Sequence, residues 1–275
     1  MGVVIKLTLS CLMAMESVDA LDEEDWWLEP EEREARRRGG KRKNEEGVTS
    51  KKKRRKISEM IKLLKPESIN DLHTTNRQLN ELSTKLQSQL KTLNEKPLSL
   101  KKKYFVSYKI EEEEEKREGK ERVSLELGPY LSNVCPMLIS WCKEGVVSNG
   151  SPYVIVLTSS AERASHLKRQ LVSSHKDISV IKLCAKHSKI EDQAAYLSSH
   201  VTHIAVGTPN RFHRLVMDDK LSMDNARLLI VDWYWRDKKL KQFYDIPEVW
   251  NDFSIFYMKT LNELVNKKQC MIGLL

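Results

Sequence analysis

The chain has 275 residues, of which 31% are charged, with a formal net charge of +8 at pH 7 and a pI of about 9.1. This length is enough for one domain with extensions. The positive balance favours a polyanionic partner, nucleic acid before membrane, although a merely soluble basic surface has the same composition. Five cysteines are present and none belongs to a Cys-x-x-Cys pair or a cysteine–histidine cluster, so we predict no metal site and no disulfide framework.

Residues 1–56 are predicted to form a disordered acidic and basic arm. Residues 3–14 are as apolar as a signal-peptide core, but a membrane span needs about 20 residues. We therefore expect a dispensable extension or a start codon placed too early. Trp26 and Trp27 lie in an acidic stretch, which indicates either a docking motif that orders on binding or a helix end packed on its own domain.

Two basic clusters follow in the same arm. Their mutual repulsion keeps this part of the chain extended. Such clusters are typical of nuclear localisation signals or of nucleic-acid contacts, and they imply an import receptor as a partner. A solvated basic helix is the alternative, but no apolar face accompanies the charges. The clusters consist of Arg36, Arg37, Arg38, Lys41, Arg42 and Lys43, and of Lys51, Lys52, Lys53, Arg54, Arg55 and Lys56.

Residues 57–122 are predicted to be a helical segment followed by a charged linker. From Leu79 to Leu93, leucines recur at three- and four-residue steps, and Pro97 ends the run. This repeat is too short for a coiled coil. The helix therefore either packs on the domain or binds a partner.

Residues 123–275 are predicted to form the folded domain. Short aliphatic runs typical of buried strands alternate there with helical patterns. The runs are residues 153–157, 180–183, 203–207, 228–231 and 269–275. The alternation predicts a three-layer α/β domain with a mainly parallel sheet. Ligands of such sheets bind beyond the carboxyl ends of the strands.

One glycine pair has the spacing of a phosphate loop. Gly145 and Gly150 are followed by Ser151 and Pro152, where such a loop requires Lys and Ser or Thr. No lysine is in place for the phosphates, and proline removes a backbone donor. We interpret the segment as an ordinary loop and predict no nucleotide cofactor.

Basic and capping residues follow two of the predicted strands. Thr208 stands at a helix start, where backbone N–H groups attract anions, and Arg211 and Arg214 would add forked hydrogen bonds to phosphate oxygens. Lys186 and Lys189 follow the preceding strand and suit a phosphate as point charges. We predict an RNA backbone contact that does not read sequence, with a plain structural helix cap as the alternative.

Several of these residues also carry a family resemblance. The run 206–211 resembles the Thr-Pro-Gly-Arg motif of DEAD-box RNA helicases, with Asn210 in place of Gly. Residues 158–164 resemble their Pro-Thr-Arg-Glu-Leu-Ala motif, which holds RNA backbone, so the resemblance implies an RNA contact for Ser160 at the Thr position. It also implies a RecA-like (P-loop-type) fold for the domain.

A closer resemblance is to the CMS-type ribosomal small subunit protein family. The residues that carry it are Trp233-Tyr234-Trp235-Arg236-Asp237 and Asp245-Ile246-Pro247-Glu248, and the resemblance is densest from residue 153 to 249. These are nuclear pre-ribosomal proteins that look like one degenerate helicase domain. The chain is identified as a member, which implies pre-rRNA and pre-ribosomal proteins as partners.

The position of the Asp-Glu-Ala-Asp box decides whether an enzyme is expected. Asp232 matches the first Asp, but Trp233 stands where a Glu would position the attacking water. With the phosphate loop also missing, we predict that the chain is not an enzyme. Trp233, Tyr234 and Trp235 are interpreted as packing or partner-binding aromatics, with base stacking as the alternative.

Together these features predict a non-catalytic nuclear and nucleolar factor in small-subunit ribosome biogenesis. Its RNA-binding surface is inferred from the residues, whereas its pre-ribosomal role is implied by the resemblance. Two alternatives remain: an RNA-dependent ATPase completed by a partner, and a purely protein-binding scaffold whose basic arm serves import.

Overall fold

The computed structural model describes residues 73–108, 125–143, 148–175, 177–186 and 188–275. The predicted arm, with Trp26, Trp27 and both basic clusters, lies outside the described residues, as does Gly145. Among the described helices, none combines the length and the apolar character that crossing a membrane requires.

Five parallel strands form the centre of the domain, in the order β2-β3-β1-β4-β5. They are β1 (Val154–Leu157), β2 (Val180–Leu183), β3 (Ile204–Gly207), β4 (Leu228–Val231) and β5 (Met271–Leu274). Every position of β1, β3 and β4 is buried, because helices cover both faces of the sheet. The predicted strands and the parallel sheet are confirmed.

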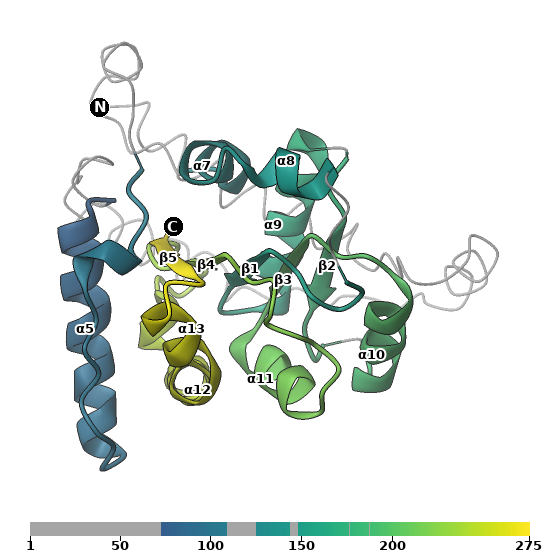
Figure 1. The fold of residues 1–275 in the computed structure, drawn as a ribbon. Coiled ribbons are helices and arrows are strands. Elements are labelled where there is room, and N and C mark those ends of the chain that lie inside the picture. The colour runs from purple at the N-terminus through teal and green to yellow at the C-terminus, as the bar shows by residue number, and fades with distance from the viewer. Residues whose placement is uncertain (1–72, 109–124, 144–147, 176, 187) are drawn as a thin grey trace, which may run out of the picture. The chain divides into compact units, whose positions relative to one another are not determined.

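Two layers of helices enclose the sheet (Figure 1). On one face lie α7 (Leu127–Val134), α8 (Leu138–Lys143) and α9 (Ala161–Ser174). On the other lie α10 (Ile190–Ser199), α11 (Pro209–Met217), α12 (Pro247–Phe256) and α13 (Asn262–Asn266). A π-helical turn, η3 (Tyr257–Leu261), joins α12 to α13, and a 3-10 turn, η2 (Phe243–Asp245), precedes α12. The predicted three-layer α/β architecture is thus confirmed.

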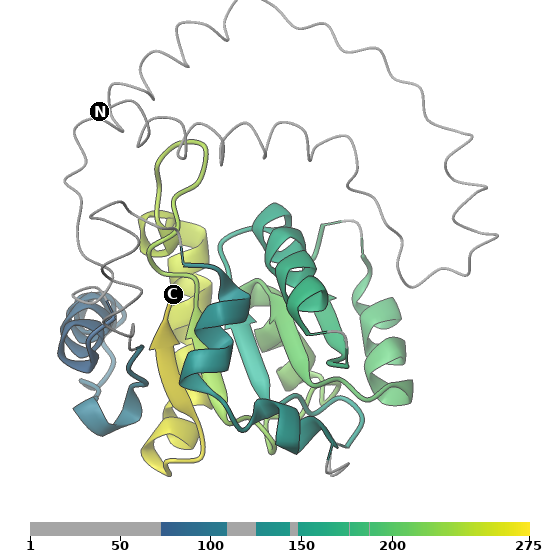
Figure 2. The same ribbon diagram turned by 90° about the horizontal axis from the view of Figure 1, so that it is seen from above.

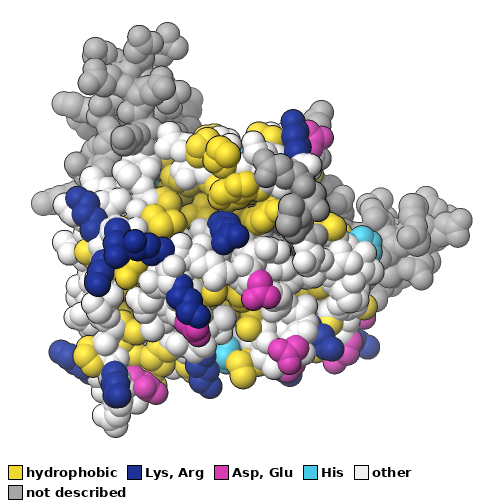
Figure 3. Space-filling model, in the orientation of Figure 1, with side chains coloured by type: hydrophobic (Ala, Val, Ile, Leu, Met, Phe, Trp, Pro, Cys, Tyr) yellow, Lys and Arg dark blue, Asp and Glu magenta, His cyan; other side chains and the backbone are white. Residues whose placement is uncertain are grey.

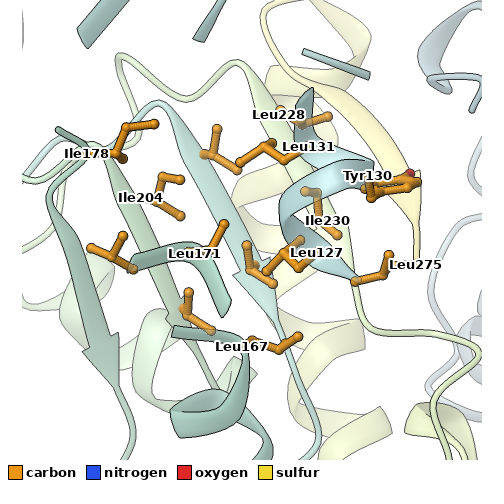
Figure 4. Close-up of a cluster of buried hydrophobic side chains, with 14 of the residues drawn as sticks. Leu127, Tyr130, Leu131, Leu167, Leu171, Ile178, Ile204, Leu228, Ile230 and Leu275 are labelled. Atoms are coloured by element: carbon orange, nitrogen blue, oxygen red, sulfur yellow. The ribbon is translucent and has the colours of Figure 1, made fainter. Parts of the chain in front are cut away.

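The core on the α7 and α9 side is mostly aliphatic, with Tyr130 among its buried side chains (Figure 4). Leu127 and Leu131 of α7 and Leu167 and Leu171 of α9 are fully buried against the sheet. Their spacing places one face of each helix on the strands. Outside this core, Figure 3 shows hydrophobic side chains gathered around α7 and α8, where Ile139 remains 47% exposed.

Helix α5 (Thr75–Thr92) runs beside the edge strand β5 (Figures 1 and 2). The fully buried Gln78 ties the two together, because its side chain donates to Val106 O at 2.9 Å and accepts from Leu274 N at 2.9 Å. The same amide donates to His73 O at 2.8 Å. Of the two alternatives for this helix, the structure therefore shows packing on the domain.

Residues just after α5 also join the sheet, although the sequence analysis placed them in a linker. They include a 3-10 turn, η1 (Lys102–Tyr104). Phe105 forms a parallel bridge with Ile272 of β5, and both Tyr104 and Phe105 are buried. The described part of the domain therefore begins before residue 123, because these aromatics complete the apolar edge at β5.

Candidate nucleic-acid interface

The carboxyl ends of all five strands meet at one edge of the sheet. In the pairing register, Gly207 stands opposite both Leu183 and Leu157, and Val231 stands opposite Leu157 and Leu274. The segments that follow the strands therefore lie side by side in strand order. They are residues 184–186 and 188–189 after β2, Thr208 after β3, residues 158–160 after β1, residues 232–236 after β4 and Leu275 after β5.

The segment after β2 is a basic loop fixed near both ends. Cys184 O accepts a hydrogen bond of 3.0 Å from the buried Gln193 side chain, and Ser188 O accepts one of 3.0 Å from Arg211. Lys186 and Lys189 lie on this loop and are exposed. The two bonds anchor the backbone at Cys184 and Ser188, which lie close to the two lysines.

Arg211 is the least exposed of the predicted phosphate contacts, with 7% of its surface exposed. Its Nη2 donates to Ser188 O, whereas its buried Nη1 has no hydrogen-bond partner among the described residues. Burial and the neighbouring Arg214 lower the pKa of Arg211. Buried donors are normally satisfied, so this guanidinium indicates a place for an additional acceptor.

The first turn of α11 lies beside this guanidinium. Thr208 is the N-cap residue, but its side chain makes no capping hydrogen bond. Its own N–H donates to Leu183 O, which fixes the residue through the backbone instead. Pro209 has no N–H. The backbone N–H of the exposed Asn210 has no partner in the described part of the chain. Arg214, one turn further along α11, is exposed.

Ser160 has a different local role. Its hydroxyl oxygen accepts a hydrogen bond of 3.2 Å from Arg163 N and caps α9. The cap fixes the start of the helix at Ser160. A hydroxyl that accepts one bond keeps its O–H as a donor, so the cap leaves one group free to meet a phosphate oxygen.

Asp232 follows β4 directly, and its carboxylate forms a buried ion pair with Arg163. Its Oδ2 accepts from Arg163 Nε and its Oδ1 from Arg163 Nη2, both at 2.9 Å. The two side chains are 1% and 9% exposed. Thr158 Oγ1 donates a longer bond of 3.4 Å to the same carboxylate. Both carboxylate oxygens thus have an internal cationic donor in the place where a metal ion would have to bind.

His166 completes this arrangement one turn along α9. Its Nδ1 lies 2.9 Å from Arg163 Nη1. Burial, then the charges of Arg163 and Arg169, lower the pKa of His166, and only Asp232 opposes this. A neutral imidazole can accept from the guanidinium, so His166 helps to orient Arg163.

The two aromatic residues after Asp232 are anchored to α5. Trp233 is 1% exposed and donates from Nε1 to Glu81 Oε2 at 2.8 Å. Burial and the Glu81 carboxylate raise the pKa of Tyr234, which also hydrogen-bonds to Glu81. Arg77 Nε donates to the other Glu81 oxygen at 2.7 Å. Glu81 therefore collects three donors, and these two aromatics pack rather than face outward.

Trp235 is placed differently from its two neighbours. The Arg163 guanidinium carbon lies 5.0 Å from the centre of the indole, within the range of a cation–π contact. Trp235 is only partly exposed. It is the member of the aromatic run that remains at the carboxyl edge.

Sequence reasoning missed Arg163, Glu81 and Gln78. For Arg163 a signal was present, because residues 163, 167 and 171 share one face of α9, and the other two are leucines. A buried charge requires a partner, so an arginine on an apolar stripe points to a buried carboxylate. The described residues contain no group of three or more His, Cys, Asp or Glu side chains placed to hold a metal.

Comparison with solved structures gives distant similarities. A DEAD box protein from Methanococcus jannaschii is 18% identical with a TM-score of 0.34, and the match covers 56% of this chain and 36% of that one. The yeast DEAD-box splicing factor Prp28 is 16% identical with a TM-score of 0.33, and the match covers 53% and 38% of the two chains.

Closer similarities are found among sequences. Protein CMSS1 of Xenopus laevis is 41% identical over 125 residues, which cover 45% of this chain and 44% of the relative. Protein CMSS1 of Homo sapiens is 35% identical over 149 residues, covering 54% and 53%. Protein CMS1 of Chaetomium thermophilum is 39% identical over 106 residues, covering 38% and 42%. The chain spans about half the length of the curated relatives it matches.

A family model matches far more of the chain. Residues 28–275 match the model named CMS1 and described as "U3-containing 90S pre-ribosomal complex subunit". This match extends well beyond residues 153–249, where the resemblance is densest, and it confirms the predicted family. The chain therefore belongs to the CMS1 family of pre-ribosomal complex subunits.

Proposed function

We propose that the protein is a non-catalytic RNA-binding factor in ribosome biogenesis, and that it contacts RNA backbone at the carboxyl edge of its sheet. The observation that carries this proposal is the buried guanidinium of Arg211, whose Nη1 has no partner among the described residues. Beside it are the backbone N–H of Asn210, which has no partner among the described residues, and the loop that carries Lys186 and Lys189. Phosphate oxygens match all three kinds of donor.

The surrounding charges agree with a phosphate ligand. Lys186, Lys189 and Arg214 are exposed and lie on the same loop or on α11. Their contacts would go to the RNA backbone, which positions the RNA without reading its sequence. A helix N-terminus attracts anions by its partial positive charge, and this adds to the side-chain charges.

The absence of catalysis is supported by the Arg163–Asp232 pair. In an NTP hydrolase of the DEAD-box type, an aspartate at this position helps to hold Mg²⁺. Here both Asp232 oxygens accept from one buried guanidinium, and Trp233 occupies the position of the catalytic glutamate. An ATPase completed by a partner would have to break this pair before a metal could bind.

The cellular part of the proposal follows the family. The family description names a U3-containing 90S pre-ribosomal complex, and this supports a proposed location in the nucleus and nucleolus with pre-rRNA and pre-ribosomal proteins as partners. The basic clusters of the arm would serve an import receptor.

RNA binding across a salt series tests the proposal. The full chain is compared with a Lys186→Ala/Lys189→Ala variant by anisotropy of a labelled RNA. Loss of two phosphate contacts is expected to flatten the slope of log K against log salt by about 1 per lysine, whatever the RNA sequence.

A matched control removes the same charge from the opposite edge of the sheet. Lys220 and Arg227 are exposed and precede β4, so a Lys220→Ala/Arg227→Ala variant loses two charges far from the basic loop. Its salt slope is expected to stay at the wild-type value. Equal slopes for both variants, or no RNA binding by the full chain, would reject the proposed site.

A further inference from the structure

The three aromatic residues after Asp232 have separate environments. Trp233 is buried and contacts Tyr244 and Trp250, with ring centroids 4.6 and 5.9 Å away. Tyr234 packs edge-on against His73 at 5.3 Å. Trp235 has no aromatic partner among the described residues, and its ring lies against the Arg163 guanidinium. Packing against neighbouring rings therefore explains why residues 233 and 234 are aromatic, but it does not explain the tryptophan at position 235.

The support beneath Trp235 is rigid. Arg163 is fixed by two hydrogen bonds to Asp232 and by the His166 contact at 2.9 Å. One face of the indole thus rests on a guanidinium whose charge is already balanced. A planar aromatic group held in this way gains stacking energy from a ligand without losing much side-chain freedom.

The position of Trp235 relates it to the phosphate contacts. The order β3-β1-β4 places its segment two strands away from Thr208, which is about 10 Å at the usual strand spacing. The two sites face the same edge, since all strands are parallel. One RNA strand lying along this edge can therefore reach both.

We propose that Trp235 is a stacking platform for an unpaired base of single-stranded RNA. This inference rests on the proposed function, and it adds the kind of RNA that the edge prefers. An indole face stacks on any base, so the platform selects unpaired bases rather than a sequence. In a duplex the bases are stacked on each other and are not available to it.

The test compares a labelled single-stranded RNA with a duplex that contains the same strand. The full chain is measured beside Trp235→Leu, which removes the aromatic ring, and Trp235→Phe, which keeps one. Trp235→Leu is expected to weaken single-strand binding about 5- to 150-fold and to leave duplex binding unchanged. Trp235→Phe is expected to retain most of the single-strand affinity. Single-stranded RNA with 5-bromouridine should photo-crosslink to Trp235, as mapped by mass spectrometry.

The outcomes separate the two proposals. If Lys186→Ala/Lys189→Ala flattens the salt slope but Trp235→Leu binds both RNAs like the wild type, the platform is wrong and the phosphate site stands. Equal weakening on both RNAs, or a crosslink that maps elsewhere, also overturns the platform. If the wild-type chain binds neither RNA, the proposed function fails and the platform fails with it.

Discussion

Replacing Arg163 by methionine probes the ion pair that closes the end of β4. Methionine keeps the length of the apolar stem but removes both donors to Asp232, which is 1% exposed. The carboxylate would keep one protein side-chain donor, Thr158, at 3.4 Å. Breaking a buried pair by removing one partner costs about 3–5 kcal/mol. For a domain of this size that corresponds to a fall in melting temperature of about 6–20 °C.

Equilibrium unfolding in urea measures this cost. The double variant Arg163→Met/Asp232→Leu is expected to recover much of the loss, because an apolar pair of similar volume leaves no buried charge unpaired. Arg169→Met, on the exposed side of the same helix, is expected to change stability by about 0.5 kcal/mol or less. A single variant within about 1 kcal/mol of the wild type, or a double variant with additive losses, would refute the reasoning.

Two further changes test how α5 is attached. Burial lowers the pKa of His73 from 6.5 to about 4, so the imidazole is neutral in the folded protein at pH 7. Burial of the neutral ring contributes to stability above pH 6.5, and this contribution is lost as the pH falls towards 4 because the unfolded chain binds the proton first. His73→Phe should therefore lose less stability than the wild type between pH 7 and pH 4.5, as measured by urea midpoints, and an identical pH dependence would contradict this. Gln78→Leu leaves Leu274 N and Val106 O without their partner and should lower the free energy of unfolding by about 1–3 kcal/mol, whereas an unchanged urea midpoint would show that the amide is dispensable.

The sheet could be predicted from the sequence because its signals are local. A strand buried on both faces is aliphatic along most of its length, and this pattern can be recognised within the strand itself. Ser160 was predictable for the same reason, since a cap depends on residues within one turn. Thr208 has the same local signal, yet its side chain does not cap α11. The backbone bond from Thr208 N to Leu183 O, which crosses between strands, has no counterpart in a local pattern.

The contacts that attach α5 to the sheet could not be predicted in this way. Glu81 and Trp233 are 152 residues apart in the chain, and Gln78 and Leu274 are 196 apart. Such contacts are set by tertiary packing, so a helical leucine pattern indicates that α5 has an apolar face but not what covers it. The role of the charged linker at Phe105 was missed for the same reason, because a single parallel bridge leaves no periodic signal.

The two buried arginines at this edge have different partners. Arg163 is neutralised by Asp232, so the end of β4 offers a ring face without net charge. Arg211 donates to a backbone carbonyl, and Glu191 is the nearby carboxylate that favours its charged form, so its charge lies beside those of the exposed Lys186 and Lys189 without a direct ion pair among the described residues. Phosphate contacts depend on salt because they release counterions, whereas stacking depends on salt far less. A single RNA strand that lies across the edge would therefore be held by charge at β2 and β3 and by its base at β4.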